Sequence, residues 1–177
     1  GPEMKSTGEV MGVGQTFGEA FYKAVTGGNQ TIPGLPTEGE TKTVFISVRD
    51  SDKPHLAKVA QQFKDYGFKL VATGGTQEYL TNQGIECERI NKVREGRPHI
   101  LDAIKNGDID IIINTTEGKQ AQEDSSSIRR NALQSKVFYM TTLSSAQATA
   151  TAYQVQLPFA VYQLQDLHQS TRINQLA

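Results

Sequence analysis

The sequence predicts a three-layer α/β fold, Rossmann-like in its layering, in which a parallel sheet is covered by helices on both faces. From residue 43 onward, short apolar strand patterns alternate with helix patterns, an order that places consecutive strands parallel through right-handed crossovers. The run from Ile111 to Ile113 is wholly apolar, which is typical of a strand buried on both faces. With 37% hydrophobic and 21% charged residues, the 177-residue chain suffices for one well-buried domain and a tail.

The first strand and helix have the clearest patterns. The β-branched run TVFISV at 43–48 predicts a strand. The helix expected at 50–67 has Pro54 in its first turn and Gly67 at its left-handed end. Its apolar face collects Leu56, Val59, Ala60 and Phe63.

The next elements are shorter. FKLVA at 68–72 predicts the second strand, and QEYLTNQG at 77–84 predicts a helix. A short strand is expected at 87–91. A helix at 98–107 would begin with a proline and end with a glycine, which places His99 in its first turn.

The last third of the domain repeats the alternation. DIDIIIN at 108–114 predicts the fourth strand, and EDSSSIRRNALQS predicts a helix with Asp124 or Ser125 as its N-cap. The remaining expected elements are a strand at 136–141, a helix at 144–154, and a last strand and turn at 159–168.

Residues 26–42 are rich in Gly, Pro and Thr and are interpreted as an interdomain linker. Residues 1–25 contain the helix pattern GQTFGEAFYKAV, which we expect to belong to a preceding domain. The independent α/β domain is then expected at 43–177. A natural-looking amino-terminal segment without an initial Met predicts a piece of a longer protein.

Composition argues against several classes of protein. The formal net charge of −1 lacks the basic excess of a broad nucleic-acid surface. No apolar run reaches the roughly 20 residues of a membrane span, and no signal-peptide pattern opens the chain. Cys87 is the single cysteine, and no Cys/His set has metal-site spacing. We therefore expect a cytoplasmic protein without metal, membrane or nucleic-acid partners.

Four loops leave the carboxyl ends of the predicted strands with polar or cationic residues, and in a parallel sheet these ends form the ligand-binding edge. The glycines of TGGT (73–76) allow backbone amides to approach an oxygen closely, at the start of a helix. Hydroxyls of Thr73 and Thr76 and the charges of Lys53 and Lys92 suit a phosphate. The polar side chains that suit a base or sugar are Asn114 and Thr116.

Each feature also has a simpler reading. TGGT could be a tight turn, and single lysines are usually solvated. Ser125–Ser127 are interpreted as caps rather than nucleophiles, and no general-base arrangement stands out. The sequence therefore predicts a binding domain without catalytic residues.

From Thr43 to about Tyr153 the chain resembles the methylglyoxal-synthase-like superfamily. ISVRDSDK, TGGT, NKVREGRPHILDAIKNG, IINTTEG and EDSSSIRRNALQ are similar to the carboxyl-terminal regulatory domain of bacterial carbamoyl phosphate synthetase large subunits. GPEMKSTGEVMGVGQTFGEAFYKA resembles the end of the preceding ATP-grasp synthetase domain of the same subunit.

The resemblance implies an allosteric domain that binds a nucleotide monophosphate. UMP, an inhibitor, or IMP would place its phosphate at Lys53, Thr73, Thr76 and Lys92. Its base and ribose would contact Ser47, Val93, Asn114 and Thr116. The segment with Tyr139 and Thr141 corresponds to the site of the activator ornithine.

The resemblance also implies a parent enzyme, a ligase that makes carbamoyl phosphate for arginine and pyrimidine synthesis from bicarbonate, glutamine-derived ammonia and ATP with Mg or Mn. Its partners would be the rest of the large subunit and a glutaminase small subunit, and a homo-oligomer is a further expectation. This domain alone would need no cofactor.

The sequence departs from the family pattern at two positions, and three alternative functions remain. Gly74 stands where relatives often have His, and Met140 stands where the ornithine segment has Asp, which predicts an altered ornithine response. An active methylglyoxal synthase would need a carboxylate base, for which Asp50 and Asp52 are the nearest candidates. The other rivals are the cyclohydrolase domain of purine synthesis and a structural or dimerising module with an empty pocket.

Overall fold

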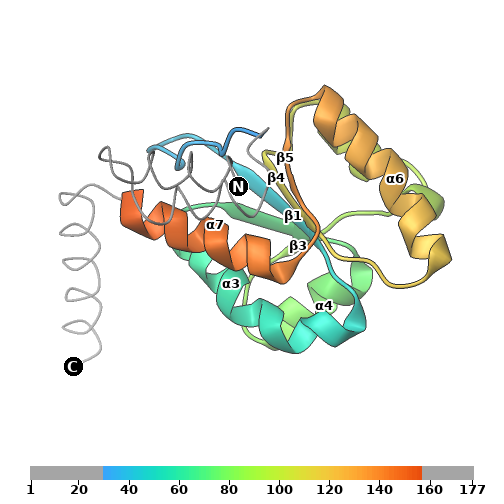
Figure 1. Ribbon diagram of the computed structural model, residues 1–177, viewed down its shortest axis with the longest axis horizontal. Coiled ribbons are helices and arrows are strands. Elements are labelled where there is room, and N and C mark those ends of the chain that lie inside the picture. Colours follow the sequence, from blue (N-terminus) through green and yellow to red (C-terminus); the bar gives the residue numbers. More distant parts are fainter. Residues whose placement is uncertain (1–29, 157–177) are drawn as a thin grey trace, which may run out of the picture.

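The computed structural model describes residues 30–156, which form a five-stranded parallel sheet flanked by helices (Figure 1). The strand order is β3-β2-β1-β4-β5. All four strand pairs are parallel, which confirms the predicted α/β class. The strands are β1 (Thr43–Ser47), β2 (Lys69–Ala72), β3 (Glu88–Arg89), β4 (Ile111–Asn114) and β5 (Phe138–Met140).

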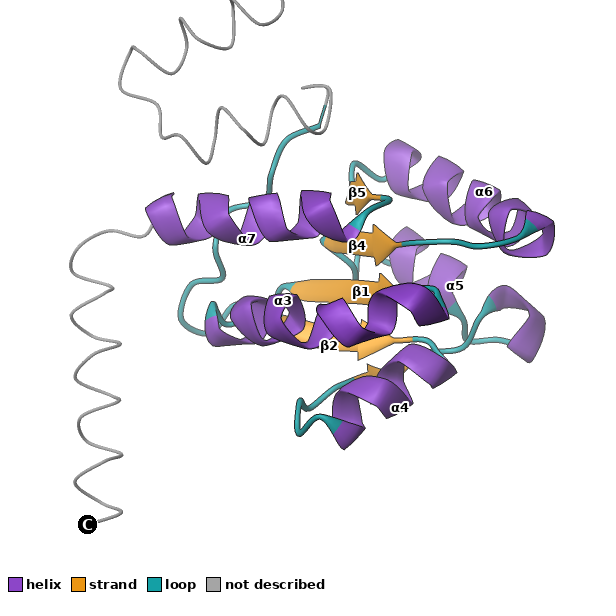
Figure 2. Cartoon of the chain, turned by 60° about the horizontal axis from the view of Figure 1, so that its bottom comes forward, coloured by secondary structure: helices purple, strands orange, loops and turns teal. Residues whose placement is uncertain are grey.

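Helices cover both faces of this sheet (Figure 2). One face packs against α3 (Lys53–Asp65), α4 (Gly74–Asn82) and α7 (Leu143–Gln156). The other packs against α5 (Ile100–Lys105) and α6 (Lys119–Gln134). Two short 3-10 turns complete the described chain, η1 (Asp50–Asp52) and η2 (Val93–Glu95).

The strands divide their side chains between two hydrophobic clusters. Along β1, Val44 and Ile46 enter the cluster under α3 and α7, whereas Phe45 enters the cluster under α5 and α6. On β4, Ile112 likewise points to the face opposite to its two isoleucine neighbours. All these side chains are 0% exposed, as the unbroken apolar run predicts for a central parallel strand.

The predicted start of the fourth helix was wrong. Neither Asp124 nor Ser125 is a cap, because α6 begins at Lys119 and its N-cap is Gly118. Residues KQAQE at 119–123 include several good helix formers, so the helix extends back to the glycine, whose φ of 89° marks the change of direction. The first two turns of α6, which were expected to lie in a loop or at the start of the helix, therefore lie alongside the carboxyl ends of the strands.

Other boundaries moved less. Helix α4 begins at Gly74 rather than at 77, so the TGGT stretch forms its N-cap and first turn. His99 precedes α5 as its N-cap instead of lying within the first turn, and its Nδ1 accepts a hydrogen bond from the Leu101 amide at 3.2 Å. Gly67, with φ of 99°, follows the end of α3 as predicted.

Residues 30–42, the described part of the predicted linker, lie against the domain. The Tyr153 hydroxyl donates to the Pro33 carbonyl at 2.6 Å, and Ile32 and Leu35 pack on the larger cluster. The Gln30 side chain exchanges two hydrogen bonds with the Tyr139 backbone on β5, at 2.7 and 2.9 Å. The expected amino-terminal helix and the expected strand at 159–168 lie outside the described residues, and the domain limits stay predictions.

Candidate functional site

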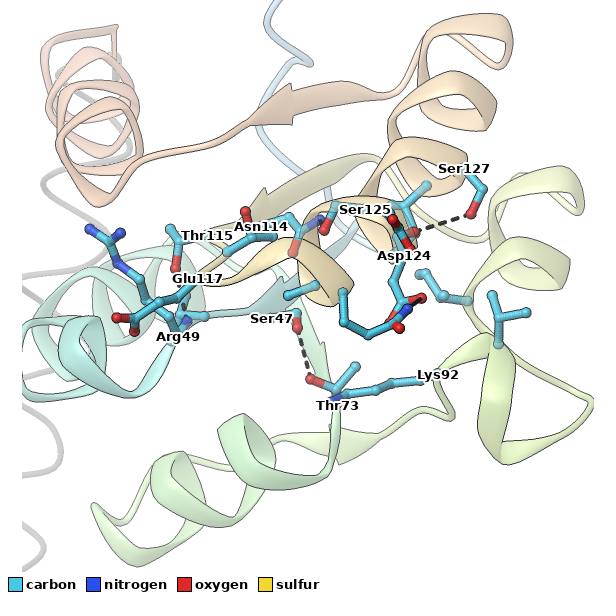
Figure 3. Close-up of a pocket in the computed structure, with 18 of the residues that line it drawn as sticks. Ser47, Arg49, Thr73, Lys92, Asn114, Thr115, Glu117, Asp124, Ser125 and Ser127 are labelled. Carbon is cyan, nitrogen blue, oxygen red and sulfur yellow. Dashed lines mark hydrogen bonds between the residues drawn. The ribbon is translucent and has the colours of Figure 1, made fainter.

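A cavity of about 510 Å³ opens at the carboxyl ends of the strands (Figure 3). Its walls come from the loops after β1, β2 and β4, from η2, and from the first half of α6. Six of the eight residues predicted to bind an effector line it: Ser47, Thr73, Lys92, Val93, Asn114 and Thr116. Lys53 and Thr76 are not among its lining residues and lie instead around the first turn of α4.

The first turn of α4 forms one end of the site. Thr73 is its N-cap in an extended conformation, and the Thr73 hydroxyl donates to the Ser47 hydroxyl oxygen at 3.0 Å. The first amides of a helix have no partner within the helix, so those of Gly74 and Gly75 are donors for an anion. Through Thr73 the cavity therefore borders a helix N-terminus that suits an anion, although Gly74 and Gly75 do not themselves line it.

Lys53 of α3 lies beside the same helix terminus, outside the lining of the cavity. Its Nζ forms an ion pair with Asp50 at 2.6 Å, and the hydrogen bond and charge of Lys53 hold the pKa of the Asp50 carboxyl below its usual range. A Cβ atom on Gly75 would lie only 3.1 Å from Lys53 Nζ. Any side chain at position 75 would therefore crowd the present position of the lysine, which lies close to the TGGT backbone.

Thr76 has a structural bond that its predicted role did not include. Its side chain is 2% exposed, and Oγ1 accepts a hydrogen bond from the Val48 amide at 3.1 Å. This bond ties the first turn of α4 to the loop after β1. Thr76 thus positions the loop after β1. Because its oxygen already accepts the Val48 amide, only its hydroxyl hydrogen remains to donate to a ligand.

We predict that Thr76→Val destabilises the protein without any ligand. The substitution preserves shape but leaves the buried Val48 amide without an acceptor, which costs about 1–3 kcal/mol. Urea unfolding measures the change. Thr81→Val, an exposed position on the same helix, is the control and should stay within about 0.5 kcal/mol of wild type. Equal effects of the two substitutions would contradict this role for Thr76.

Asn114 lies at the centre of the opposite end. It is 4% exposed, and its Nδ2 donates to Ser125 Oγ and to Tyr139 Oη, both at 3.0 Å. Burial raises the pKa of the Tyr139 hydroxyl, which therefore stays protonated. Among the hydrogen bonds of residues 30–156, none uses Asn114 Oδ1, which leaves this oxygen as an acceptor for a ligand N–H or O–H.

Helix α6 supplies lining residues that the sequence reasoning missed. They are Gln120, Ala121, Glu123, Asp124, Ser125, Ser127 and Ile128. Ser125 contacts Asn114, and Asp124 forms an ion pair across the cavity with Arg94 of η2 at 3.2 Å. The sequence feature that could have revealed these residues is the short interval between the fourth strand and Gly118. This interval brings the following helix directly to the carboxyl ends of the strands.

Both signs of charge occur around the site, mostly as ion pairs. Lys53, paired with Asp50, lies beside the TGGT turn and Lys92 lines the cavity, whereas α6 contributes the carboxylates of Glu123 and of Asp124, which is paired with Arg94. Cations and backbone amides suit a phosphate, and carboxylates with an amide oxygen suit sugar hydroxyls or the N–H groups of a base. The arrangement fits a phosphorylated molecule with a polar, uncharged remainder.

The segment predicted to contact ornithine is split. Tyr139 is 7% exposed and faces Asn114, whereas Thr141 is exposed beyond the end of β5. Met140 is 2% exposed, and its sulfur accepts a hydrogen bond from Thr149 Oγ1 at 3.2 Å. The structure thus connects Tyr139 to the cavity only through Asn114, and neither Tyr139 nor Thr141 lines it.

Two further properties concern residues 30–156 alone. They contain no group of three or more His, Cys, Asp and Glu side chains arranged to hold a metal ion. None of their helices has both the length and the apolar character needed to cross a membrane.

Comparison with known proteins adds independent findings. A model of the MGS-like domain family matches residues 55–141. The chain is 53% identical over 168 residues to a carbamoyl phosphate synthase large chain from Pseudomonas syringae, and 52% identical over 170 residues to that of Pasteurella multocida. These alignments cover 95% and 96% of this chain but only 15% of each relative, so the chain spans a small part of the proteins it matches.

A solved structure agrees on the fold. The crystal structure of methylglyoxal synthase from Elizabethkingia anophelis superposes with a TM-score of 0.53 at 22% identity, covering 73% of this chain and 85% of that one. The family match, the parallel sheet and the large-chain relatives agree with one another. The chain therefore belongs to the MGS-like domain family, in the form present in carbamoyl phosphate synthase large chains.

Proposed function

We propose that this domain binds a nucleoside monophosphate, such as UMP or IMP, as the allosteric effector of a carbamoyl phosphate synthase large chain. The observation that supports the proposal is the cavity itself, which is lined by the N-cap of α4 and by a buried asparagine whose side-chain oxygen is a free acceptor. The phosphate would lie at Thr73, Lys53 and Lys92. The base and ribose would lie toward Asn114, Thr116, Val93 and Ser47.

The parent reaction belongs to the same proposal. The full large chain would act with a glutaminase subunit and ATP with Mg or Mn, in the cytoplasm, to make carbamoyl phosphate. This domain would contribute regulation and no catalytic step. UMP would act as an inhibitor by favouring one arrangement of the domain against the synthetase domain, and a coupling of roughly 1–3 kcal/mol suffices for substantial inhibition.

A chain of contacts supports this coupling. Asn114 in the cavity donates to the Tyr139 hydroxyl, and the Tyr139 backbone bonds to the side chain of Gln30. Gln30 begins the described part of the segment that would lead back to the synthetase domain. A movement of Asn114 upon ligand binding would therefore be transmitted through Tyr139 and Gln30 to that segment.

Ornithine is a second proposed effector of the parent enzyme, with an altered response here. The ammonium of ornithine requires an anionic partner, and at position 140 this chain has a buried methionine bonded to Thr149. Activation of the full enzyme by ornithine at the level usual for its relatives would refute this part of the proposal.

Thermal melts of the chain with UMP, IMP, dihydroxyacetone phosphate and ornithine test the proposal. UMP or IMP at 100 times its dissociation constant should stabilise the fold by about 2.7 kcal/mol. For a domain of this size, that corresponds to a melting temperature roughly 5–11 °C higher. Lys92→Ala should weaken UMP about tenfold, because it removes one charge-assisted hydrogen bond to the phosphate.

Lys58→Ala is the matched control, since Lys58 is exposed on α3 and does not line the cavity. Its response to UMP should equal that of wild type. A shift with dihydroxyacetone phosphate alone would favour a methylglyoxal synthase-like lyase. No shift with any nucleotide would overturn the proposal and favour a structural module.

A further inference from the structure

The side chain of Arg89, at the end of β3, occupies the space beside Gly74 of α4. A Cβ atom on Gly74 would lie 3.1 Å from Nη2 and 3.2 Å from Cζ of Arg89, the last residue of β3. The guanidinium group is therefore packed against the backbone of the first α4 residue. Neither the strand pattern nor the TGGT motif indicates this contact, because residue 89 is separated from residue 74 by a whole helix and a turn.

Arg89 and Lys53 flank the same helix terminus. Lys53 Nζ lies as close to Gly75 as Arg89 Nη2 lies to Gly74, with 3.1 Å to the ideal Cβ position in each case. The N-terminus of a helix carries about half a positive charge, so cations there are unfavourable unless an anion joins them. Two cations thus lie beside the first turn of α4, an arrangement that favours negative charge at this position.

At present each cation is neutralised by an exposed carboxylate. Lys53 pairs with Asp50, whose side chain is 92% exposed. Arg89 Nη2 pairs with Glu95 Oε2 at 3.2 Å, and Glu95 also accepts a hydrogen bond from the Lys92 amide at 2.8 Å. That backbone hydrogen bond is the main reason that the pKa of Glu95 lies below its usual range. Ion pairs of this exposure are weak, so a ligand anion with several oxygens can replace the carboxylates.

We infer that Arg89 is a further phosphate-binding residue of the proposed effector site, which it shares with Lys53, Lys92 and the TGGT amides. The inference rests on the proposed function and deepens it. A guanidinium presents N–H donors in a planar fork that matches two phosphate oxygens. Arg89 thereby makes the site select a phosphomonoester dianion over the corresponding neutral nucleoside, and a side chain at position 74 would displace the guanidinium from its present place by a few tenths of an ångström.

Isothermal titration of the chain with UMP and with uridine tests the inference in four proteins. They are wild type, Arg89→Leu, Arg89→Lys and Arg130→Leu. Arg89→Leu should weaken UMP about five- to tenfold, the loss of one solvent-accessible charge-assisted hydrogen bond, and leave uridine unchanged. Arg89→Lys keeps the charge without the fork and should fall between wild type and Arg89→Leu. Weakening of UMP by Arg89→Leu should diminish as salt is added, because screening reduces the contribution of the charge.

Arg130→Leu makes the same change of charge at an exposed position on α6 and should bind UMP as wild type does. If wild type binds UMP and Arg89→Leu binds it equally well, the inference is wrong and the proposed function stands. If Arg89→Leu loses UMP and uridine in parallel, Arg89 has only a structural role and the inference is also wrong. If wild type binds no nucleotide, the proposed function fails and takes the inference with it.

Discussion

Phe63→Ala is expected to lower the free energy of unfolding by about 3–5 kcal/mol. Phe63 is 0% exposed on α3 and contacts two other aromatic rings, with centroids 5.7 Å from Phe68 and 6.2 Å from Tyr153 in edge-to-face geometry. Truncation would leave a cavity where three elements meet. Because Tyr153 also binds the Pro33 carbonyl, the loss should loosen the segment at 30–42 as well.

Chemical denaturation measures this change, and hydrogen exchange at residues 34–42 reports the loosening. Leu133→Ala is the control, since Leu133 is 55% exposed and lies outside both clusters. It should change stability by no more than about 0.5 kcal/mol. A Phe63→Ala effect below about 1 kcal/mol would mean that the α3–α7 layer is not the main core.

Asn114→Leu should weaken UMP binding by about a hundredfold or more. The substitution removes the free Oδ1 and both donors from a position that is 4% exposed, and a buried ligand N–H would then have no partner. It also leaves the Tyr139 hydroxyl without its donor, so a loss of about 1–3 kcal/mol of stability is expected in the absence of ligand.

Titration calorimetry at a temperature where the variant remains folded separates the two effects. Tyr139→Phe retains the Asn114 side chain and removes only one of its partners, so its loss of affinity should be smaller. Asn106→Leu, at the exposed end of α5, serves as the control. Unchanged UMP affinity in Asn114→Leu would mean that the base is recognised elsewhere.

The sequence was sufficient for the sheet and for the edge on which the cavity lies. Apolar runs such as Ile111–Ile113 and the alternation of strands with helices fix parallel pairing, and the carboxyl ends of the strands then meet. That rule alone placed Ser47, Thr73 and Asn114 near one another. The rule depends on topology, which local sequence patterns determine well.

The directions of side chains were not predictable in the same way. Thr76 binds Val48, and Arg89 packs against Gly74, because tertiary packing brings together residues distant in sequence. The residues of α6 were missed because Asp124 and Ser125 resemble a cap, whereas the preceding helix formers extend the helix to Gly118. Tertiary contacts therefore decided the positions of Thr76 and Arg89, and the helix propensity of residues 119–123 decided the start of α6.

The most direct test of the proposed site is a ¹H–¹⁵N NMR titration of the protein with UMP. If a phosphate binds at the first turn of α4, the backbone amides of Gly74 and Gly75 should show the largest shifts, together with the side-chain amide of Asn114. Uridine should shift Asn114 and leave the two glycines nearly unchanged. Saturation with UMP that leaves both glycine amides in place, or that shifts only residues of the α3–α7 face, would contradict the assignment of this cavity as the nucleotide site.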